Sequence, residues 1–475
     1  MEKLLQDAVI TNENSIFRPL LEETIADAYK RLMAPAAERE LRNMLTERAE
    51  AEAVKVFAKN TEKLLMVPPV KGARIISIDP GYRTGCKVAV LNETGKLLAY
   101  TTVFPTEPKK DIKGTEAVLG KLVDKFRINT IVIGNGTASR ETEEVVADFI
   151  KKSGRDISYT IVNEAGASVY SASKLATEEY PDLDVTVRGA MSLGRRLQDP
   201  LAELVKIDPK SIGVGQYQHD MNQKKLSEAL SGVVEDCVNK VGVDLNTASA
   251  PLLSYISGIS SAIAKNIVAY REENGRFQSR KDLLKVAKLG PKAYEQCAGF
   301  MRIQDAKNPL DGTSVHPESY EAAEKLLEKQ GFQTSDINGG KLTGLSLTIK
   351  DYGRLAQELG IGEITLRDIV RELEKPARDP RDEMPKPILR TDVLEMKDLT
   401  EGMVLKGTVR NVIDFGVFVD IGVHQDGLVH ISEITDKKFI KHPLEAVSVG
   451  DIVDVKVLSV DPKRKRIQLT MKGIS

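Results

Sequence analysis

Three acidic residues occupy positions from which they could act on a phosphodiester. Asp79 ends an apolar segment, Glu164 comes just past another, and Asp199 lies in the run Arg-Arg-Leu-Gln-Asp-Pro. Carboxylates that converge at strand ends can hold divalent metal ions beside a phosphodiester. The three acids are therefore candidates for the catalytic cluster of a metal-dependent nuclease.

The same acids also have structural roles open to them. Asp79 and Glu164 could cap the turn and the helix that follow them, and Asp199 could pair with Arg195 or Arg196. The Gly-Asn-Gly-Thr loop of the chain lacks the lysine and Ser/Thr of a phosphate-cradling loop, so nucleotide hydrolysis has no support. The residues alone leave catalysis open, and we assign no metal ligand and no cofactor.

Aromatic residues near the C-terminus lie where a base could stack. In the segment 416–421, aliphatic residues alternate with Phe418 and Asp420, so a strand that buries the aliphatic residues holds Phe418 on its wetter face. His430 belongs to the next predicted strand and comes near Phe418 and Phe415 if the two strands pair. Flat rings on an exposed sheet surface are what unpaired bases stack upon.

The C-terminal segment from about 400 to 472 resembles the RNA-binding OB fold of the ribosomal S1 type. The resemblance rests on its Phe-Gly-Val-Phe and Leu-Val-His-Ile-Ser elements and on five predicted strands, which suit a small Greek-key barrel. The residues that it implies as contacts of a single strand are Phe415, Phe418, His430, Asp461 and either Lys465 or Arg466. The alternative is a barrel whose aromatic residues only cap its core.

Two glycine-containing turns join predicted helices in the middle of the chain. Gly258 lies in Ile-Ser-Gly-Ile-Ser, and Gly290 lies in Lys-Leu-Gly-Pro-Lys, where Pro291 suits the first turn of a helix. The repeat resembles a pair of helix-hairpin-helix motifs, which implies that backbone amides near Gly258, Gly290 and Lys292 grip a phosphate without reading sequence. Both glycines are expected to be intolerant of bulky substitution. One such turn alone would be an ordinary helical connection.

Positive charge is concentrated around these two turns. The stretch 251–307 carries ten Lys/Arg against five Asp/Glu, whereas the whole chain has 68 Lys/Arg, 69 Asp/Glu and a net charge of −1. A local excess of positive charge favours contact with a nucleic-acid backbone. We therefore predict that this stretch binds the backbone of DNA or RNA.

Length and composition limit the possible classes of protein. A chain of 475 residues should divide into several domains. It has no apolar run long enough to span a bilayer and no secretory signal pattern, which predicts a cytoplasmic protein that does not contact membranes. Its 3 cysteines are far apart and odd in number, so a dense disulfide framework is excluded.

The periodicity of apolar residues divides the chain into segments of different class. The predicted segments are a helical scaffold at 1–70, an RNase H-like α/β domain at 73–200, a helical connector at 201–245, a tandem helix-hairpin-helix region at 246–307, a helical domain at 308–374, a linker at 375–397 and an OB-fold barrel at 398–473. The fold class is therefore multidomain, with α/β, all-α and all-β parts. The linker is dense in proline and charge, so we expect it to be extended and the barrel to be mobile.

The α/β segment follows the element order of an RNase H-like sheet. Three predicted strands, a helix, a strand, a second helix and a further strand succeed one another between residues 74 and 162. Asp79, at the end of the first strand, fits the first position of the acidic cluster of such a fold.

Long strings throughout the chain resemble the bacterial Tex transcription accessory proteins. They are IDPGYRTGC at 78–86, GNGTASR at 134–140, NEAGASVYSAS at 163–173, GVGQYQHD at 213–220 and HPESY at 316–320. The resemblance covers nearly the whole chain and begins near Ala26. Members of the family usually start with a further helical region, so we expect either a shortened member or a truncated product.

The resemblance implies a nucleic-acid-binding factor in transcription. The α/β domain of the family is similar to the YqgF and RuvC resolvases, although its members are regarded as binders and not as established nucleases. We therefore expect sequence-tolerant binding of RNA or DNA, single-stranded or duplex, beside RNA polymerase or ribosome-associated machinery. The alternatives are a divalent-metal-dependent nuclease of the resolvase type and a protein-binding scaffold.

Overall fold

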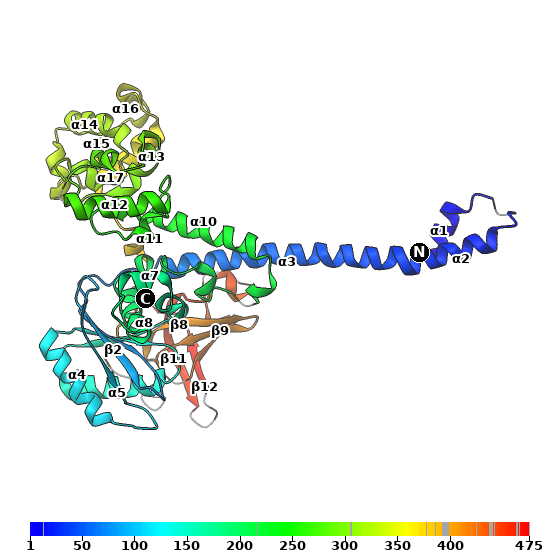
Figure 1. Ribbon diagram of the computed structural model, residues 1–475, viewed down its shortest axis with the longest axis horizontal. Coiled ribbons are helices and arrows are strands. Elements are labelled where there is room, and N and C mark those ends of the chain that lie inside the picture. The colour runs from blue at the N-terminus through cyan, green and yellow to red at the C-terminus, as the bar shows by residue number, and fades with distance from the viewer. Residues whose placement is uncertain are drawn as a thin grey trace.

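The computed structural model divides the chain into an N-terminal helical arm, a mixed sheet, a helical region and a barrel (Figure 1). The described residues are 1–12, 14–215, 217–304, 306–376, 378–384, 386–391, 399–423, 425–436, 440, 442–461, 464 and 466–474. Within these residues, no helix is both long enough and apolar enough to cross a bilayer. The described cysteines Cys86, Cys237 and Cys297 are all buried as free thiols.

The N-terminal helices project from the rest of the molecule as an arm (Figure 1). They are α1 (Glu2–Val9), α2 (Arg18–Ala28), a π-helical turn (Tyr29–Met33) and α3 (Ala34–Leu65). Only the last part of α3 packs against the body, where Phe57 and Leu65 are buried. Leu41 and Leu45, which lie on the projecting part, are exposed.

A five-stranded mixed sheet forms the core of the α/β domain. Its strands are β1 (Ile75–Asp79), β2 (Cys86–Leu91), β3 (Leu97–Val103), β4 (Thr130–Gly134) and β5 (Ser158–Val162), in the order β3-β2-β1-β4-β5. Strands β1, β4 and β5 run parallel, and β2 and β3 are antiparallel to their neighbours. This arrangement confirms the predicted RNase H-like sheet.

Helices cover both faces of this sheet. They are α4 (Ile112–Phe126) and α5 (Ser139–Ser153) on one face and α8 (Val185–Gln198) on the other. Because successive side chains of a strand point to opposite faces, Ile76 packs in the core that α4 and α5 complete, while Ile75 packs in the core that α8 completes. A strand buried on both faces explains why β1 reads as a continuous apolar run.

Short helices and one long helix lead from the sheet to the helical region. They are α6 (Ala167–Ser171), α7 (Lys174–Glu179), α9 (Pro200–Leu204), two 3-10 turns (Pro209–Ser211 and Gln218–Asp220) and α10 (Gln223–Val241). Helix α10 packs along the end of α3, so residues from both helices share one apolar core. The arm is thereby anchored to the body.

The helical region contains two successive cores. The first holds β6 (Val243–Asp244), α11 (Ala250–Leu253), α12 (Ser261–Asn274), a 3-10 turn (Arg280–Lys285), α13 (Pro291–Cys297), a second 3-10 turn (Ala298–Phe300) and β7 (Met301–Arg302). The second holds 3-10 turns at Pro309–Gly312, Pro317–Ser319 and Thr334–Gly339 together with α14 (Tyr320–Lys329), α15 (Leu345–Thr348), α16 (Tyr352–Leu359) and α17 (Glu363–Glu374). The predicted all-α part is confirmed.

The C-terminal strands close into a barrel. They are β8 (Val404–Ile413), β9 (Gly416–Asp420), β10 (Gly427–His430), β11 (Ile452–Asp461) and β12 (Arg466–Thr470), in the closed order β10-β12-β11-β8-β9. Val417, Val419 and Val429 are fully buried inside it. The alternating pattern in β9 therefore predicted the inner face correctly, and the OB-type barrel is confirmed.

The segment predicted to be a free linker is packed in its described part. Arg381 lies in the short 3-10 turn Pro380–Glu383, is only 4% exposed and pairs with both Asp199 and Asp379 at 2.8 Å. A buried guanidinium between two carboxylates fixes the backbone on both sides of it. This stretch is thus attached to the α/β domain.

Further contacts hold the barrel against the body. The backbone of Arg390 exchanges hydrogen bonds of 2.7 and 2.8 Å with Tyr159 and so extends the sheet beyond β5. Its guanidinium lies 3.6 Å from Glu143 of α5 and 3.9 Å from Asp420 of β9. Contacts therefore fix the barrel where the sequence predicted mobility.

Candidate nucleic-acid interface

One outer face of the barrel carries most of the predicted contact residues. The strand register places Leu428 of β10 beside Phe418 of β9 and beside Gln468 of β12. His430 lies two residues beyond Leu428, and Arg466 lies two residues before Gln468, so both share this face. Phe418 and Leu428 are half-buried, while His430, Arg466 and Gln468 are exposed. A flat platform with a cationic edge results, which suits a stacked base and its phosphate.

The turn before β9 adds a second aromatic ring at the edge of this face. Phe415 is 54% exposed, and its backbone oxygen accepts a 2.9 Å hydrogen bond from the amide of Ile431. The Nδ1 atom of His430 lies 2.9 Å from the hydroxyl of Ser432. These bonds hold the turn and the imidazole in place, so the two rings need little ordering before a ligand arrives.

Arg466, one of the two alternative basic contacts, lies at the far end of the same face. Asp461 at the end of β11 is the register partner of Arg466 at the start of β12. Asp461 also accepts a 3.1 Å hydrogen bond from the amide of Arg464, which shapes the turn. Lys465, the alternative basic contact, lies outside the described residues. Arg466 is therefore the described one of the two predicted basic contacts, and it borders the aromatic surface.

The two basic hairpins repeat one backbone template at an offset of thirty residues. In the first, Gly258 has a φ of +79° and Ser260 caps helix α12. In the second, Lys288 has a φ of +68° and Gly290 takes the capping position of α13. The positive-φ residue and the capping residue are thus separated by one apolar residue in both turns.

Gly290 does not adopt the left-handed backbone that a glycine in a hairpin suggests. Its φ is −86°, and a Cβ atom there would meet no heavy atom within 4 Å. Lys288 adopts the left-handed backbone of this hairpin in its place, at a cost that a glycine would avoid. The backbone of Gly290 therefore does not require a glycine, and the expected intolerance of bulky residues there stays a prediction about the approach of a phosphate.

Gly258 allows close packing within the protein. A Cβ atom there would lie 2.8 Å from the Cβ of Gln296 and 3.3 Å from the backbone oxygen of Ala293, both in α13. The first hairpin therefore packs its glycine against the second motif. The neighbour that approaches this glycine is α13, where a phosphate was expected.

We expect the same substitution to have opposite effects at the two glycines. Gly258→Ser should lower the free energy of unfolding by about 1–2 kcal/mol, because a side chain is strained at positive φ and collides with α13. Gly290→Ser should be neutral or stabilising by about 1 kcal/mol, because serine is a good helix cap and occupies the equivalent position in the first hairpin. Urea denaturation followed by circular dichroism compares the two variants. Equal losses at both positions would contradict this view.

A third hairpin of the same form lies in the second helical core. Gly360 has a φ of +70°, Ile361 follows it, and Gly362 precedes helix α17. The Gly-Ile-Gly string was visible in the sequence and was not recognised there. Its surroundings differ in charge, because residues 308–374 carry seven Lys/Arg against twelve Asp/Glu. This hairpin is therefore a poor candidate for phosphate.

The α/β domain brings two of the three candidate acids together. A Cβ atom on Gly136 would overlap the carboxylate of Glu164, and one on Gly189 would lie 3.4 Å from Oδ2 of Asp79. Burial and the nearby charge of Glu164 raise the pKa of Asp79 to about 6. Two carboxylates thus lie close to one another at the carboxyl ends of β1 and β5.

Asp199 does not join this pair. Asp199 caps helix α9 by accepting a hydrogen bond from the amide of Ala202, and it forms an ion pair with Arg381. Asp79 lies beside Gly189 of α8, which is more than two helical turns before Asp199. Among the described residues, no group of three His, Cys, Asp or Glu side chains could hold a metal ion. The partner of Asp199 is thus neither Arg195 nor Arg196, and the proposed three-acid cluster is not assembled.

The raised pKa of Asp79 predicts a pH-dependent stability effect. The pKa of Asp79 is 3.8 in the unfolded chain and about 6 in the folded one. As pH rises, the carboxyl of the unfolded chain therefore loses its proton first. The free energy of unfolding falls between these two pH values. Asp79→Asn removes this penalty and should add about 2–3 kcal/mol at pH 8 and little at pH 4. Denaturation midpoints at both pH values test this. A variant less stable than the parent at pH 8 would show that the charged carboxylate is stabilising.

Four family descriptions match the sequence. They are the Tex protein YqgF-like domain at 73–198, the helix-hairpin-helix motif at 238–302, the HHH domain at 308–381 and the S1 RNA binding domain at 398–472. The third match covers the hairpin at Gly360. The region predicted only as a helical domain thus has a helix-hairpin-helix character of its own.

Curated proteins resemble the chain over almost its whole length. The uncharacterized protein YdcI of Bacillus subtilis is 53% identical over 98% of this chain and 65% of its own length. Protein tex of Bordetella pertussis is 52% identical over 92% of this chain and 55% of its own length. The transcriptional accessory protein Tex of Neisseria gonorrhoeae is 49% identical over 95% and 59%. The chain therefore spans less than two thirds of the length of these relatives.

Proposed function

The chain belongs to the Tex family, and we propose that it is a cytoplasmic nucleic-acid-binding accessory factor of transcription. Its barrel takes a single strand of RNA or DNA, and its two basic hairpins contact the nucleic-acid backbone without reading sequence. The observation that carries the proposal is the strand register that gathers Phe418, His430 and Arg466 on one outer face of the barrel. Its S1 and helix-hairpin-helix matches belong to families that bind nucleic acid.

The barrel and the hairpin region make different kinds of contact with a nucleic acid. Exposed rings on the barrel stack on bases of any sequence, which requires the bases to be unpaired. The hairpin region contributes positive charge and exposed Lys292 beside the start of α13, which suits phosphates of a single or double strand. A ligand with both a duplex and a single-stranded part would occupy both modules. RNA polymerase and ribosome-associated machinery, which handle such nucleic acids, are the proposed settings.

The resolvase-like nuclease is the second candidate, and the acid geometry argues against it. Two-metal phosphodiester chemistry needs several carboxylates around the ions. Asp79 and Glu164 lie together, but Asp199 is engaged with Arg381. We therefore propose that the α/β domain serves as a scaffold that holds the helical region and the barrel.

A binding and cleavage assay tests this function. The parent protein is titrated into labelled single-stranded RNA, single-stranded DNA, duplex and branched DNA at several salt concentrations, and then incubated with manganese. We expect binding to single strands of unrelated sequence, with affinity that falls steeply as salt rises because phosphate contacts release counterions. We expect no metal-dependent products from any substrate.

Two outcomes would change the assignment. Products formed by the parent and abolished in Asp79→Asn would promote the nuclease reading. A parent protein that binds none of the oligonucleotides at low salt would overturn the binding function itself. Cleavage that is equal in the parent and in Asp79→Asn would mark a contaminant and leave the binding result to decide.

A further inference from the structure

A polar cavity of the described structure lies between the α/β domain and the first helical core. It has a volume of about 680 Å3, which is within the range of sites for small organic ligands. Its walls come from the β2–β3 turn, the end of α8, α9, the β6–α11 loop, β7 and the turn around Arg381. None of the residues assigned above to nucleic-acid contact lines it. The function proposed above therefore leaves this cavity unexplained.

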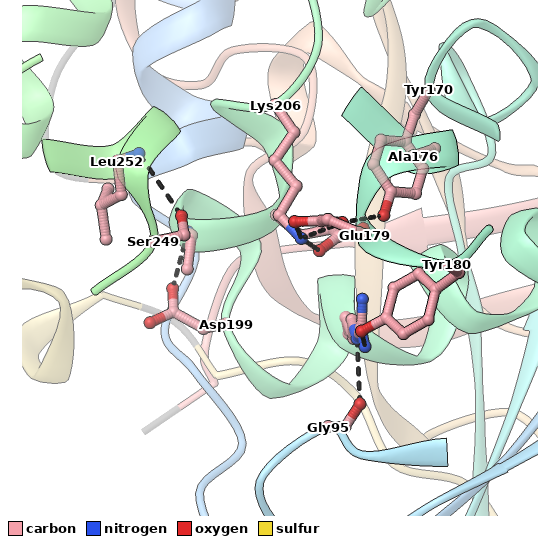
Figure 2. A network of polar contacts seen from close by, with 12 residues as sticks. Gly95, Tyr170, Ala176, Glu179, Tyr180, Asp199, Lys206, Ser249 and Leu252 are labelled. Atoms are coloured by element: carbon pink, nitrogen blue, oxygen red, sulfur yellow. Dashed lines mark hydrogen bonds and ion pairs between the residues drawn. The ribbon is translucent and has the colours of Figure 1, made fainter. Parts of the chain in front are cut away.

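Most charged groups in the cavity wall already have partners. Lys206 forms 3.1 Å ion pairs with both Glu179 and Glu203, and Figure 2 shows its amino group next to Glu179, to which the hydroxyl of Tyr170 also points. Arg195 donates a 3.0 Å hydrogen bond to the backbone oxygen of Gly95. These groups are internally neutralised, so they shape the wall and leave little free charge.

Arg381 is also engaged, since it lies between Asp199 and Asp379. The exposed Lys71 stands at the edge of the wall. Arg302 is the remaining mostly buried cation in the cavity wall, and its hydrogen bonding differs from that of the other cations.

The Nε atom of Arg302 in β7 has no hydrogen-bond partner among the described residues. Its side chain is mostly buried over Gly242, with Nε 3.1 Å from the position of a Cβ there, and Nε makes no hydrogen bond. Asp379 and Glu372 act on it only through space, and burial lowers its pKa. A buried Nε atom without an acceptor is costly. The two terminal nitrogens of the guanidinium are not among the buried atoms without partners, so they can meet an occupant of the cavity.

Two acceptors in the same wall are unsatisfied as well. Oε1 of Gln198 has no donor, although the amide nitrogen of this side chain donates to the backbone oxygens of Ala73 and Asn92. Oε1 of Glu203, a residue only 3% exposed, also has no donor. Buried polar atoms without partners are uncommon in proteins. Both residues line the same cavity as Arg302, but each Oε1 atom is covered by protein, so a polar occupant reaches it only after the side chain turns toward the cavity.

We propose that this cavity binds a small organic anion whose phosphate or carboxylate pairs with Arg302 and whose hydroxyl or amino groups donate to Gln198 and Glu203. The planar fork of a guanidinium matches either anionic group with two parallel hydrogen bonds. A nucleoside monophosphate and an amino acid both combine these features. Because the walls come from two domains, the bound molecule ties the α/β domain to the helical region.

The test compares melting temperatures of the full chain with and without probes. Guanosine monophosphate, adenosine monophosphate, glutamate and inorganic phosphate are added singly at millimolar concentration to the parent and to Arg302→Met. We expect one organic probe to raise the melting temperature of the parent by about 2 °C or more and to leave Arg302→Met unchanged, because ligands that bind the folded state stabilise it. The probe that acts identifies the anionic group, and inorganic phosphate alone should have a smaller effect.

The ligand-free variants provide a second readout. Without any probe, Arg302→Met should melt at the same temperature as the parent or higher, because it removes a mostly buried charge whose Nε atom has no acceptor. Arg302→Gln serves as a second variant if the methionine disturbs folding, and the exposed Arg276→Met is the matched control that keeps the probe response. Destabilisation of both Arg302 variants, or a parent that no organic probe stabilises, would overturn the proposal. Arg302 lies within 251–307, but its side chain is mostly buried at the cavity, so oligonucleotide binding through the exposed basic residues of this stretch should be nearly unchanged in Arg302→Met. This readout separates the test from that of the proposed function.

Discussion

Arg280→Met is expected to unfold the helical region of this protein. Arg280 is completely buried, and its guanidinium donates to the backbone oxygens of Met301, Val315 and Thr313 and to the hydroxyl of Tyr320. The bonds to Met301 and Val315 are both 2.7 Å long. One side chain thus satisfies acceptors from both helical cores and holds them together.

The charge of this arginine is balanced by Asp311. That carboxylate accepts a 3.1 Å hydrogen bond from the backbone amide of Arg280 and a 2.7 Å hydrogen bond from Tyr320. Methionine would fill the space but leave several buried carbonyls without donors, at a cost of about 1–3 kcal/mol for each unsatisfied group, and it would leave the Asp311 carboxylate without a balancing positive charge. We therefore expect a loss of at least about 4 kcal/mol.

Limited proteolysis and urea denaturation measure this effect. Cleavage of Arg280→Met should appear first between residues 251 and 374, while the barrel and the sheet stay protected. The exposed Arg276→Met is the control for loss of a surface arginine. A denaturation curve of Arg280→Met that superimposes on that of the parent would show that the buried network contributes nothing.

Phe418→Ala combined with His430→Ala is expected to weaken single-strand binding at least about thirty-fold. Each lost stacking partner costs about 1–3 kcal/mol, and tenfold in affinity corresponds to about 1.4 kcal/mol. Phe418 is half-buried between Asn411 and Leu428 in the register, so its loss also opens the surface. The melting temperature of the variant must therefore be measured alongside its affinity.

A matched control uses aromatic residues that lie elsewhere on the surface. Tyr100 is 57% exposed on β3, and Tyr217 is 72% exposed beside α10. Tyr100→Ala combined with Tyr217→Ala should leave the dissociation constant for a single-stranded oligonucleotide unchanged. If the barrel variant folds like the parent and binds with the affinity of this control, the stacking face is placed wrongly.

The barrel was the part of the fold that the sequence predicted best. A strand places alternate residues on opposite faces, so the buried positions of Val417 and Val419 also fixed the outward position of Phe418. The partner strand was uncertain, because periodicity says nothing of pairing. The register between β9 and β10 then placed Leu428, with His430 two residues beyond, on the same face as Phe418.

In the hairpins, the presence of a glycine does not always predict which residue has a positive φ. Gly258 does take a positive φ, yet in the second hairpin the positive φ belongs to Lys288, and Gly290 has ordinary backbone. Aligning the two turns by their buried residues, Ile256 with Val286, would have revealed this offset. The third hairpin was missed although its Gly-Ile-Gly string carries the same signal.

The sequence by itself determined which elements form and which side chains face a core, because helix and strand periodicities are local properties of the chain. It thereby determined the fold class and the outward face of the barrel strands, while the resemblance to the Tex proteins came from long strings such as IDPGYRTGC. The tertiary structure alone decided which distant groups meet. It placed Glu164 where its charge acts on Asp79, paired Asp199 with Arg381, and left the Nε atom of Arg302 without an acceptor at a cavity between two domains. Contacts between residues far apart in the chain depend on how whole elements pack, and no local pattern records that packing.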